Sequence, residues 1–167
     1  MAEGWILTEE GEIETGLDLI RKSAPILIEQ GDPWIPSLIG LCATALGRHA
    51  TPSEGLQMLN VALPHFHAKQ AHWWDAELYR IKGELLARLK GEDENKEACL
   101  RQALRIARKQ EAKSLELRAA IAVARLLRDQ DQKALAHDTL APIYDWFTEG
   151  FDTPDLIDAR TLLDELS

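Results

Sequence analysis

Apolar residues along the chain recur every three or four positions, the spacing that lines one face of an α-helix. The clearest series are Ile35, Leu38, Cys42 and Ala45; Leu56, Leu59, Leu63 and Phe66; Trp74, Leu78, Ile81, Leu85 and Leu89; and Ala136, Leu140, Tyr144 and Phe147. Alternation of β-branched residues is nearly absent, and valine occurs only at Val61 and Val123. Leucine and alanine, which favour helices, dominate the apolar set. The pattern therefore predicts an all-α fold.

Glycine and proline residues divide this pattern into segments. Clusters of helix breakers lie at 31–33, 47–53, 91–93 and 150–154. Pro52 suits the first turn of a helix, where its missing N–H is not needed, and Thr153 before Pro154 is typical of a helix N-cap. Together these signals predict helices at about 2–9, 12–28, 34–46, 53–68, 72–90, 94–110, 113–129, 131–147 and 154–166.

Every second predicted helix carries the same short pattern. A small or tolerated residue is followed by an apolar residue four positions later and by a mostly small residue after three more. The four instances are Gly16-Ile20-Ser23, Gly55-Leu59-Ala62, Lys96-Leu100-Ala103 and Ala136-Leu140-Ile143, which begin 39, 41 and 40 residues apart. A small residue lets two helices approach closely, and the apolar residue one turn later fills the seam. The spacing indicates an internal repeat of helical hairpins.

The repeat resembles the second helix of a tetratricopeptide repeat (TPR), although its period exceeds the usual ~34 residues and HEAT-like repeats are an alternative. The resemblance predicts one domain over 1–167, a right-handed α-solenoid of TPR-like hairpins with a C-terminal capping helix. The expected units are about 1–30, 34–69, 72–110 and 113–148, followed by the cap at 154–166. In that cap, Leu156, Ala159, Leu163 and Leu166 form the apolar face, and Asp155, Asp158 and Asp164 point largely away. The first hairpin has no cap, so we expect the chain to be the tail of a longer array.

Composition narrows the class of protein. The 167 residues carry 19 basic and 28 acidic side chains, a net charge of −9, which argues against a nucleic-acid partner. The ends are acidic and the middle is basic: residues 33–128 hold 15 basic against 10 acidic side chains. The chain has two cysteines, no long apolar run and no N-terminal signal pattern. We expect a cytoplasmic protein that does not bind membranes.

Three stretches are similar to segments of large bacterial signalling ATPases. They are residues 73–86, residues 98–108 together with 114–120, and residues 146–153. Proteins of that family combine a class III nucleotide cyclase or DNA-binding domain, an AAA/STAND-type ATPase and a C-terminal TPR-like array. The resemblance is strongest over 72–166. It implies that this chain is the non-catalytic array, and that the enzymatic domains are absent from it.

The resemblance also implies a binding groove, because the first helix of each TPR hairpin lines the concave face. The residues placed there are Trp74, Glu77, Arg80, Glu84, Arg118, Arg125 and Arg128. The expected partner is a protein or peptide, either an acidic segment held by the arginines or the ATPase domain of the same polypeptide. Three alternatives stay open: arginines paired with acids of a neighbouring hairpin, self-association through the uncapped N-terminal hairpin, and a small-molecule sensor near Trp34, Tyr79 and Trp74.

No residue pattern indicates catalysis, a cofactor or a metal. The nearest approach to a phosphate-binding loop, residues 16–23, has Arg21 in place of the second glycine and lies inside a predicted helix. His65 and His67 are two positions apart, so a helix would point them to nearly opposite faces, and no carboxylate is evidently placed beside His72. Cys42 and Cys99 are expected to be reduced, buried thiols. We therefore expect a protein that is not an enzyme.

Overall fold

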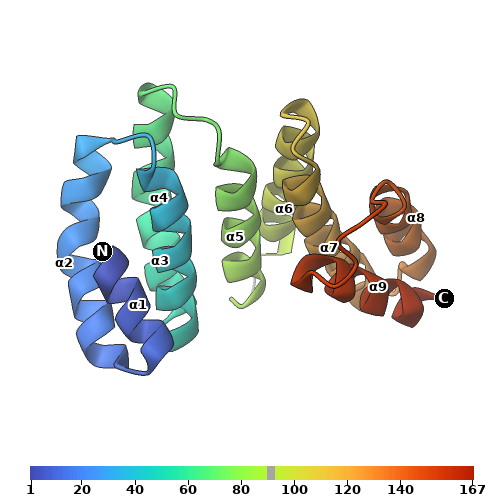
Figure 1. Cartoon of the computed structure of the whole chain (residues 1–167), viewed down its shortest axis with the longest axis horizontal. Coiled ribbons are helices and arrows are strands. Elements are labelled where there is room, and N and C mark those ends of the chain that lie inside the picture. The colour runs from blue at the N-terminus through green and yellow to red at the C-terminus, as the bar shows by residue number, and fades with distance from the viewer. Residues whose placement is uncertain (90–92) are drawn as a thin grey trace.

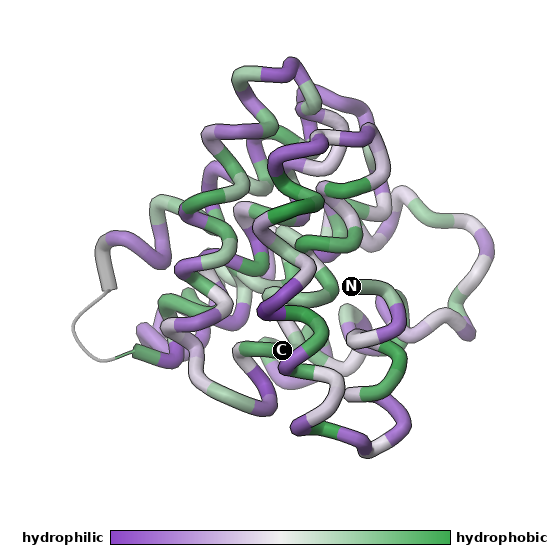
Figure 2. The backbone as a smooth tube through the Cα atoms, turned by 90° about the vertical axis from the view of Figure 1, so that its left-hand side faces the viewer, coloured by the Kyte–Doolittle hydropathy of each residue, from purple (hydrophilic) through white to green (hydrophobic). Residues whose placement is uncertain are grey.

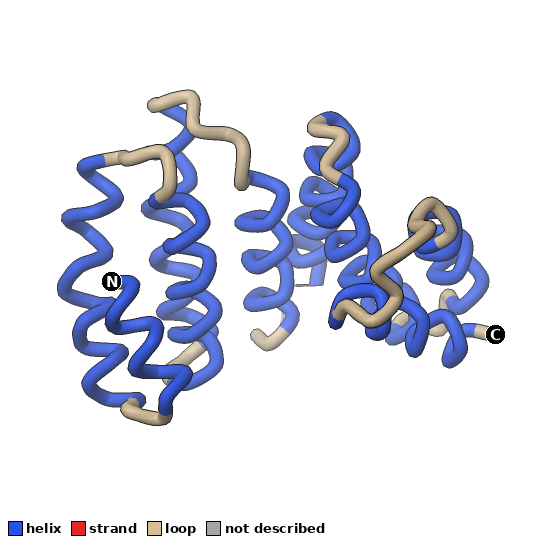
Figure 3. Tube along the Cα trace, in the orientation of Figure 1, coloured by secondary structure: helices blue, strands red, loops and turns tan. Residues whose placement is uncertain are grey.

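The computed structural model describes residues 1–89 and 93–167, and this part of the chain is all-α. Its helices are α1 (Ala2–Glu10), α2 (Ile13–Gln30), α3 (Ile35–His49), α4 (Pro52–Ala68), α5 (Asp75–Ala87), α6 (Asp93–Lys109), α7 (Lys113–Asp129), α8 (Lys133–Tyr144) and α9 (Pro154–Leu166). Each predicted helix has its counterpart, and the prediction of an all-α fold is confirmed. Figure 3 shows these helices joined by loops.

Local signals explain most helix ends. Thr51 caps α4, its side-chain oxygen accepting a hydrogen bond from the Glu54 N–H at 3.2 Å, and Pro52 occupies the first helical position as expected. Gly11 and Gly31 end α1 and α2 in the left-handed conformation, with φ of 96° and 66°, which glycine adopts without steric cost.

Two predicted helices are too long. The segment 72–90 contains α5 only from Asp75 to Ala87, because the carbonyl of His72 accepts bonds from the Asp75 N–H and from the Gln110 side chain, which makes a turn there. Position 90 and the first two residues of the breaker cluster at 91–93 lie outside the described residues. The segment 131–147 contains α8 only from Lys133 to Tyr144, because the Phe147 N–H turns back to the Tyr144 carbonyl.

The helices pack as consecutive pairs in an open row (Figure 1). Each pair joins an odd-numbered helix to the next even one, from α1 with α2 to α7 with α8. Every odd helix also contacts the next odd helix, from α1 through α3, α5 and α7 to α9. Among the described residues α1 and α9 do not touch, and the two termini lie toward opposite ends of the row. The chain is therefore not a closed bundle.

The repeated pattern marks where the helices meet. Its apolar positions Ile20, Leu59 and Leu140 are completely buried, and Leu100 is nearly so. A Cβ atom added to Gly16 would lie 2.6 Å from the carbonyl oxygen of Gly4 in the paired helix. At Gly55 the same atom would lie 2.4 Å from a carbonyl oxygen of α3. A side chain at these two positions would thus force the paired helices apart.

The buried apolar residues form two clusters. One extends over α1 to α5 and the other over α6 to α9, and the half-buried Tyr79 contacts both. Apolar and polar residues alternate along the helices accordingly (Figure 2). In the part of the chain that the structure describes, no helix combines the length and hydropathy needed to cross a bilayer.

The last helix differs from its predicted orientation. Its buried residues are Leu156, Ala159, Leu162 and Leu166, whereas Leu163 is only half-buried. Asp155 and Asp158, which we expected to point away from the chain, lie half-buried against α7. The helix is therefore rotated from the predicted face, because its acids find arginine partners on the preceding odd helix.

Candidate functional site

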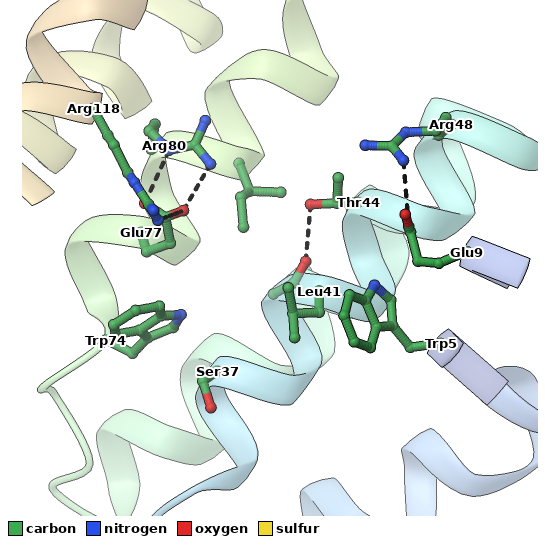
Figure 4. Close-up of a pocket in the computed structure, with 12 residues that line it drawn as sticks. Trp5, Glu9, Ser37, Leu41, Thr44, Arg48, Trp74, Glu77, Arg80 and Arg118 are labelled. Carbon is green, nitrogen blue, oxygen red and sulfur yellow. Dashed lines mark hydrogen bonds and ion pairs between the residues drawn. The ribbon is translucent and has the colours of Figure 1, made fainter. Parts of the chain in front are cut away.

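A hollow of about 320 Å³ opens on the face formed by the odd-numbered helices. Figure 4 shows side chains from α1, α3, α5 and α7 converging around it. Its lining residues are Trp5, Glu9, Ser37, Gly40, Leu41, Thr44, Arg48, Trp74, Glu77, Arg80, Ile81 and Arg118. One helix from each of the four pairs contributes, so the hollow depends on how the pairs stack. We call this set of residues the groove.

One wall of the groove is apolar. Trp5 comes from α1, Leu41 from α3, and Trp74 immediately precedes α5. Gly40 allows this close packing, since a Cβ atom there would lie 3.2 Å from Ile81 Cδ1 and 3.5 Å from Trp74 Nε1. Leu41 is 43% exposed and Trp74 is half-buried, so both offer apolar surface to a ligand.

The tryptophan pair at 73–74 divides as predicted. Trp74 packs between helix pairs in the groove, whereas Trp73 is exposed. Trp73 meets Trp34 edge to face at 5.9 Å and donates from Nε1 to the Pro33 carbonyl at 2.8 Å. The aromatic residues considered for a small-molecule site are not brought together, because Tyr79 stacks on His67 and only Trp74 lines the groove.

A buried carboxylate organises the other wall. Glu77 is 6% exposed and accepts hydrogen bonds from Arg80 at 2.8 and 2.9 Å and from Arg118 at 3.3 Å. Arg80 also bonds to Glu84. Burial alone would raise the pKa of Glu77, but the hydrogen bonds and charges of the two arginines outweigh it and hold the pKa below its ordinary value. The same partners raise the pKa of Arg80, so this network is fully ionised at neutral pH.

The α7 arginines are bonded to the last helix. Arg118 donates to Asp155 at 2.7 Å and Arg128 donates to Glu165 at 2.6 Å, and Arg125 pairs in the same way with Asp158. Pairing with acids of a neighbouring element was one of the alternatives left open by the sequence, and it describes all three residues. An acidic ligand would have to compete with α9 for these guanidinium groups.

The seven predicted groove residues fall into three positions. Trp74, Glu77, Arg80 and Arg118 line the groove. Glu84 and Arg125 line a smaller neighbouring hollow of about 170 Å³, which also includes Arg80 and Arg118. Arg128 lies outside both hollows and bonds to Asp129 and Glu165.

Sequence reasoning missed the groove residues of the first two pairs, Trp5, Ser37, Leu41, Thr44 and Arg48. The repeat could have found one of them. Leu41 and Ile81 are 40 residues apart and both line the groove, and Ile121, another 40 residues on, lines the smaller hollow. Trp5 had no such signal, because it meets the groove only through the packing of α1 on α3.

The expected thiols and the loop-like segment take structural positions. Cys42 is completely buried, and burial raises the pKa of its thiol to about 12. Cys99 is half-buried, and burial raises its thiol pKa as well. These shifts oppose thiolate formation at neutral pH. Residues 16–23 lie inside α2, where Gly16 packs on the Gly4 carbonyl and leaves no room for a phosphate.

One cluster brings metal-ligating atoms together within the described residues. His67, His72 and Asp75 each offer one ligand atom, and these atoms lie within 4.8 Å of one another. The sequence analysis compared His65 with His72 and found no carboxylate nearby. The turn at 69–74 brings in His67 instead, together with the first residue of α5.

No family model matches the chain, and no curated protein matches it significantly. The geometry of the groove is therefore the basis for a functional assignment.

Proposed function

We propose that the chain is a non-catalytic protein-interaction module that binds a short segment of a partner protein in the groove. In this proposal the row of helix pairs is a right-handed TPR-like solenoid and α9 is its cap. The supporting observation is the 320 Å³ hollow, to which an odd-numbered helix of each of the four pairs contributes. Peptide-binding helical arrays present their ligand surface in this way, as an extended concave face.

The apolar wall is the part of the groove best suited to carry affinity. Binding energy concentrates in a few aromatic and apolar contacts that exclude water. Trp5, Leu41 and Trp74 provide such a surface. The hydroxyls of Ser37 and Thr44 already donate to the carbonyls of Trp34 and Gly40, which leaves their oxygens free to accept from a ligand N–H. We infer a partner segment with a large apolar side chain seated among these residues.

The arginines have a different role in this proposal. Arg80 and Arg118 are held by Glu77, and Arg118 also by Asp155. Because their charges are already neutralised, they orient the groove rather than attract an acidic peptide. Binding of a carboxylate at Arg118 would require Asp155 to release it.

The first partner to test is an ATPase domain joined to the same polypeptide. The similarity of residues 72–166 to the C-terminal arrays of bacterial signalling ATPases supports this choice. In such an arrangement the array would regulate the ATPase by holding one of its segments.

The test is selection from a random peptide display library against the chain, followed by fluorescence anisotropy on the enriched peptides. Leu41→Ser and Trp74→Ala should each weaken binding roughly 30-fold, the effect of losing a contact worth about 2 kcal/mol. Trp146→Ala is the matched control, because Trp146 is 57% exposed and lies outside the groove. Equal affinity of both groove variants and the control would refute the proposed site, and a larger loss in Arg118→Glu would favour an acidic ligand.

A second candidate function is self-association through the first two helix pairs. A hollow of about 250 Å³ between α2 and α4 is lined by Pro25, Ile28, Met58 and Val61, among others, and Val61 is 58% exposed. If this surface joins two copies, Val61→Glu should reduce the mass measured by light scattering to that of a monomer. Ile157→Glu, at a similarly exposed position on α9, should leave it unchanged. A wild-type chain that is monomeric at high concentration would exclude this function.

A further inference from the structure

Three potential ligand side chains meet where the second helix pair passes to the third. His67 lies near the end of α4, His72 lies in the connecting turn, and Asp75 is the first residue of α5. Asp75 Oδ2 lies 3.0 Å from His67 Nε2 and 2.9 Å from His72 Nδ1. The two imidazole rings are 5.0 Å apart between centroids. Both histidines therefore present a ring nitrogen to the same carboxylate oxygen.

Two polar atoms of this cluster are buried without a hydrogen-bond partner. One is Nε2 of His67, whose 3.0 Å contact with Asp75 does not have hydrogen-bond geometry. The other is Oδ1 of Asp75, a residue that is only 5% exposed. Buried polar atoms of native proteins are nearly always satisfied, and each one that is not requires an explanation. A cation bound between these side chains would satisfy the imidazole nitrogen and compensate the buried carboxylate.

The geometry points to a Zn²⁺ site formed by His67 Nε2, His72 Nδ1 and Asp75 Oδ2. Zinc sites with two histidines, one carboxylate and a water in the fourth position are built from this donor set. Zinc–ligand bonds of about 2.0–2.2 Å in a tetrahedron place donor atoms about 3.3 Å apart. The two distances to Asp75 are already close to that value, and the exposed His72 ring can turn to complete it.

Neighbouring residues hold the ligands in place. The backbone carbonyl of His72 accepts a hydrogen bond from Gln110 Nε2 at 2.7 Å, which fixes the turn to the end of α6. The His67 ring stacks on Tyr79 of α5, with 6.4 Å between centroids. Such outer contacts orient metal-binding residues in known sites. His72 is exposed, so the ion has access from solvent.

Zinc at this position would join α4 to α5 across the loop that links two helix pairs. Asp75 directly follows Trp74, a wall of the groove. The metal would thus fix the position of a groove residue, although the zinc site itself does not depend on what the groove binds.

The test is calorimetric titration of ZnCl₂ into the untagged, chelator-treated chain, with Co²⁺ absorption at 500–650 nm as a second readout. We expect one ion per chain and the visible bands of four-coordinate cobalt. His72→Ala and Asp75→Asn should each weaken binding at least tenfold, because even the loss of an outer-shell partner costs about 10–100-fold. His137→Ala is the matched control, since His137 is exposed on α8 and lies outside the cluster.

Thermal unfolding and circular dichroism separate binding from folding. Zinc should raise the midpoint of the wild type and of His137→Ala, and it should not raise that of His72→Ala. Because His72 is exposed in a turn, this variant should keep the helical spectrum of the wild type. The proposal is overturned if the wild type shows neither heat nor cobalt bands, or if the His72 and His137 variants bind zinc equally. Either result would mean that Asp75 serves only as a hydrogen-bond acceptor for the two imidazoles.

Discussion

The odd-numbered helices present two different surfaces at the two ends of the row. Between α1, α3 and α5 they leave a hollow walled by Trp5, Leu41 and Trp74. Between α7 and α9 the same face is covered by ion pairs, from Arg118 with Asp155 to Arg128 with Glu165. Both regions are built on the same buried apolar repeat. The repeat therefore determines how helices stack, and the residues facing outward from it decide whether the face is open or closed.

The charge distribution along the sequence has the same explanation. The basic middle of the chain and its acidic end are partly complementary, because three acids of α9 bond to three arginines of α7. These pairs are between one-third and two-thirds exposed, and exposed pairs contribute only about 0.2–1 kcal/mol each. The apolar residues of α9 hold the helix in place, and the ion pairs select its orientation.

The largest effect should come from truncating the repeat itself. Leu59→Ala and Leu140→Ala remove completely buried side chains at equivalent positions in the two regions. Each should lower the free energy of unfolding by about 2–5 kcal/mol, measured by urea denaturation. Hydrogen exchange should increase mainly in α1–α5 for the first variant and in α6–α9 for the second, because the two clusters are separate. Equal loss of protection in both regions would show that the chain has a single cooperative core.

A smaller effect is expected at the residue that links the two regions. Glu77 on α5 bonds to Arg118 on α7, and Glu77→Gln should cost about 1.5–3 kcal/mol at pH 7, the worth of hydrogen bonds to a charged group. The folded-state pKa of Glu77 lies below its ordinary value of 4.5. Its stabilising contribution is therefore complete above about pH 4.5 and disappears as pH falls through the lower folded-state pKa.

Denaturation between pH 7 and 3 measures this contribution. The wild type should lose more stability over that range than Glu77→Gln does. Glu84→Gln is the matched control, because Glu84 bonds to the same Arg80 but its side chain is 46% exposed. An equal pH dependence of the wild type and Glu77→Gln would contradict the assigned role of this carboxylate.

The smallest effect should come from the closed end of the row. A double-mutant cycle on Arg125→Ala and Asp158→Ala should give a coupling of about 0.2–1 kcal/mol that decreases with added salt. Leu156→Ala, which removes a buried contact of the same helix, should cost several times more. A coupling above that range would mean that ion pairs, and not apolar contacts, hold α9 in place.

Part of the candidate site could be predicted from the sequence. Trp74, Glu77, Arg80 and Arg118 were placed in the groove because they lie on the first helix of successive hairpins, and they do line it. Arg128 was placed there by the same reasoning, but it faces Glu165. Helical periodicity defines the face of a residue only to within part of a turn, and the partner on another helix decides the remainder.

The amino-acid sequence alone determined the helices and their repeat, because both depend on residues within a few positions of one another. The apolar spacing, the Thr51 cap and the glycines that end α1 and α2 act locally. Only the tertiary structure decided which residues share the hollow, how α9 is rotated, and that His67, His72 and Asp75 meet. Those features depend on how helix pairs stack and how the turn at 69–74 folds, and neither is a property of any single helix.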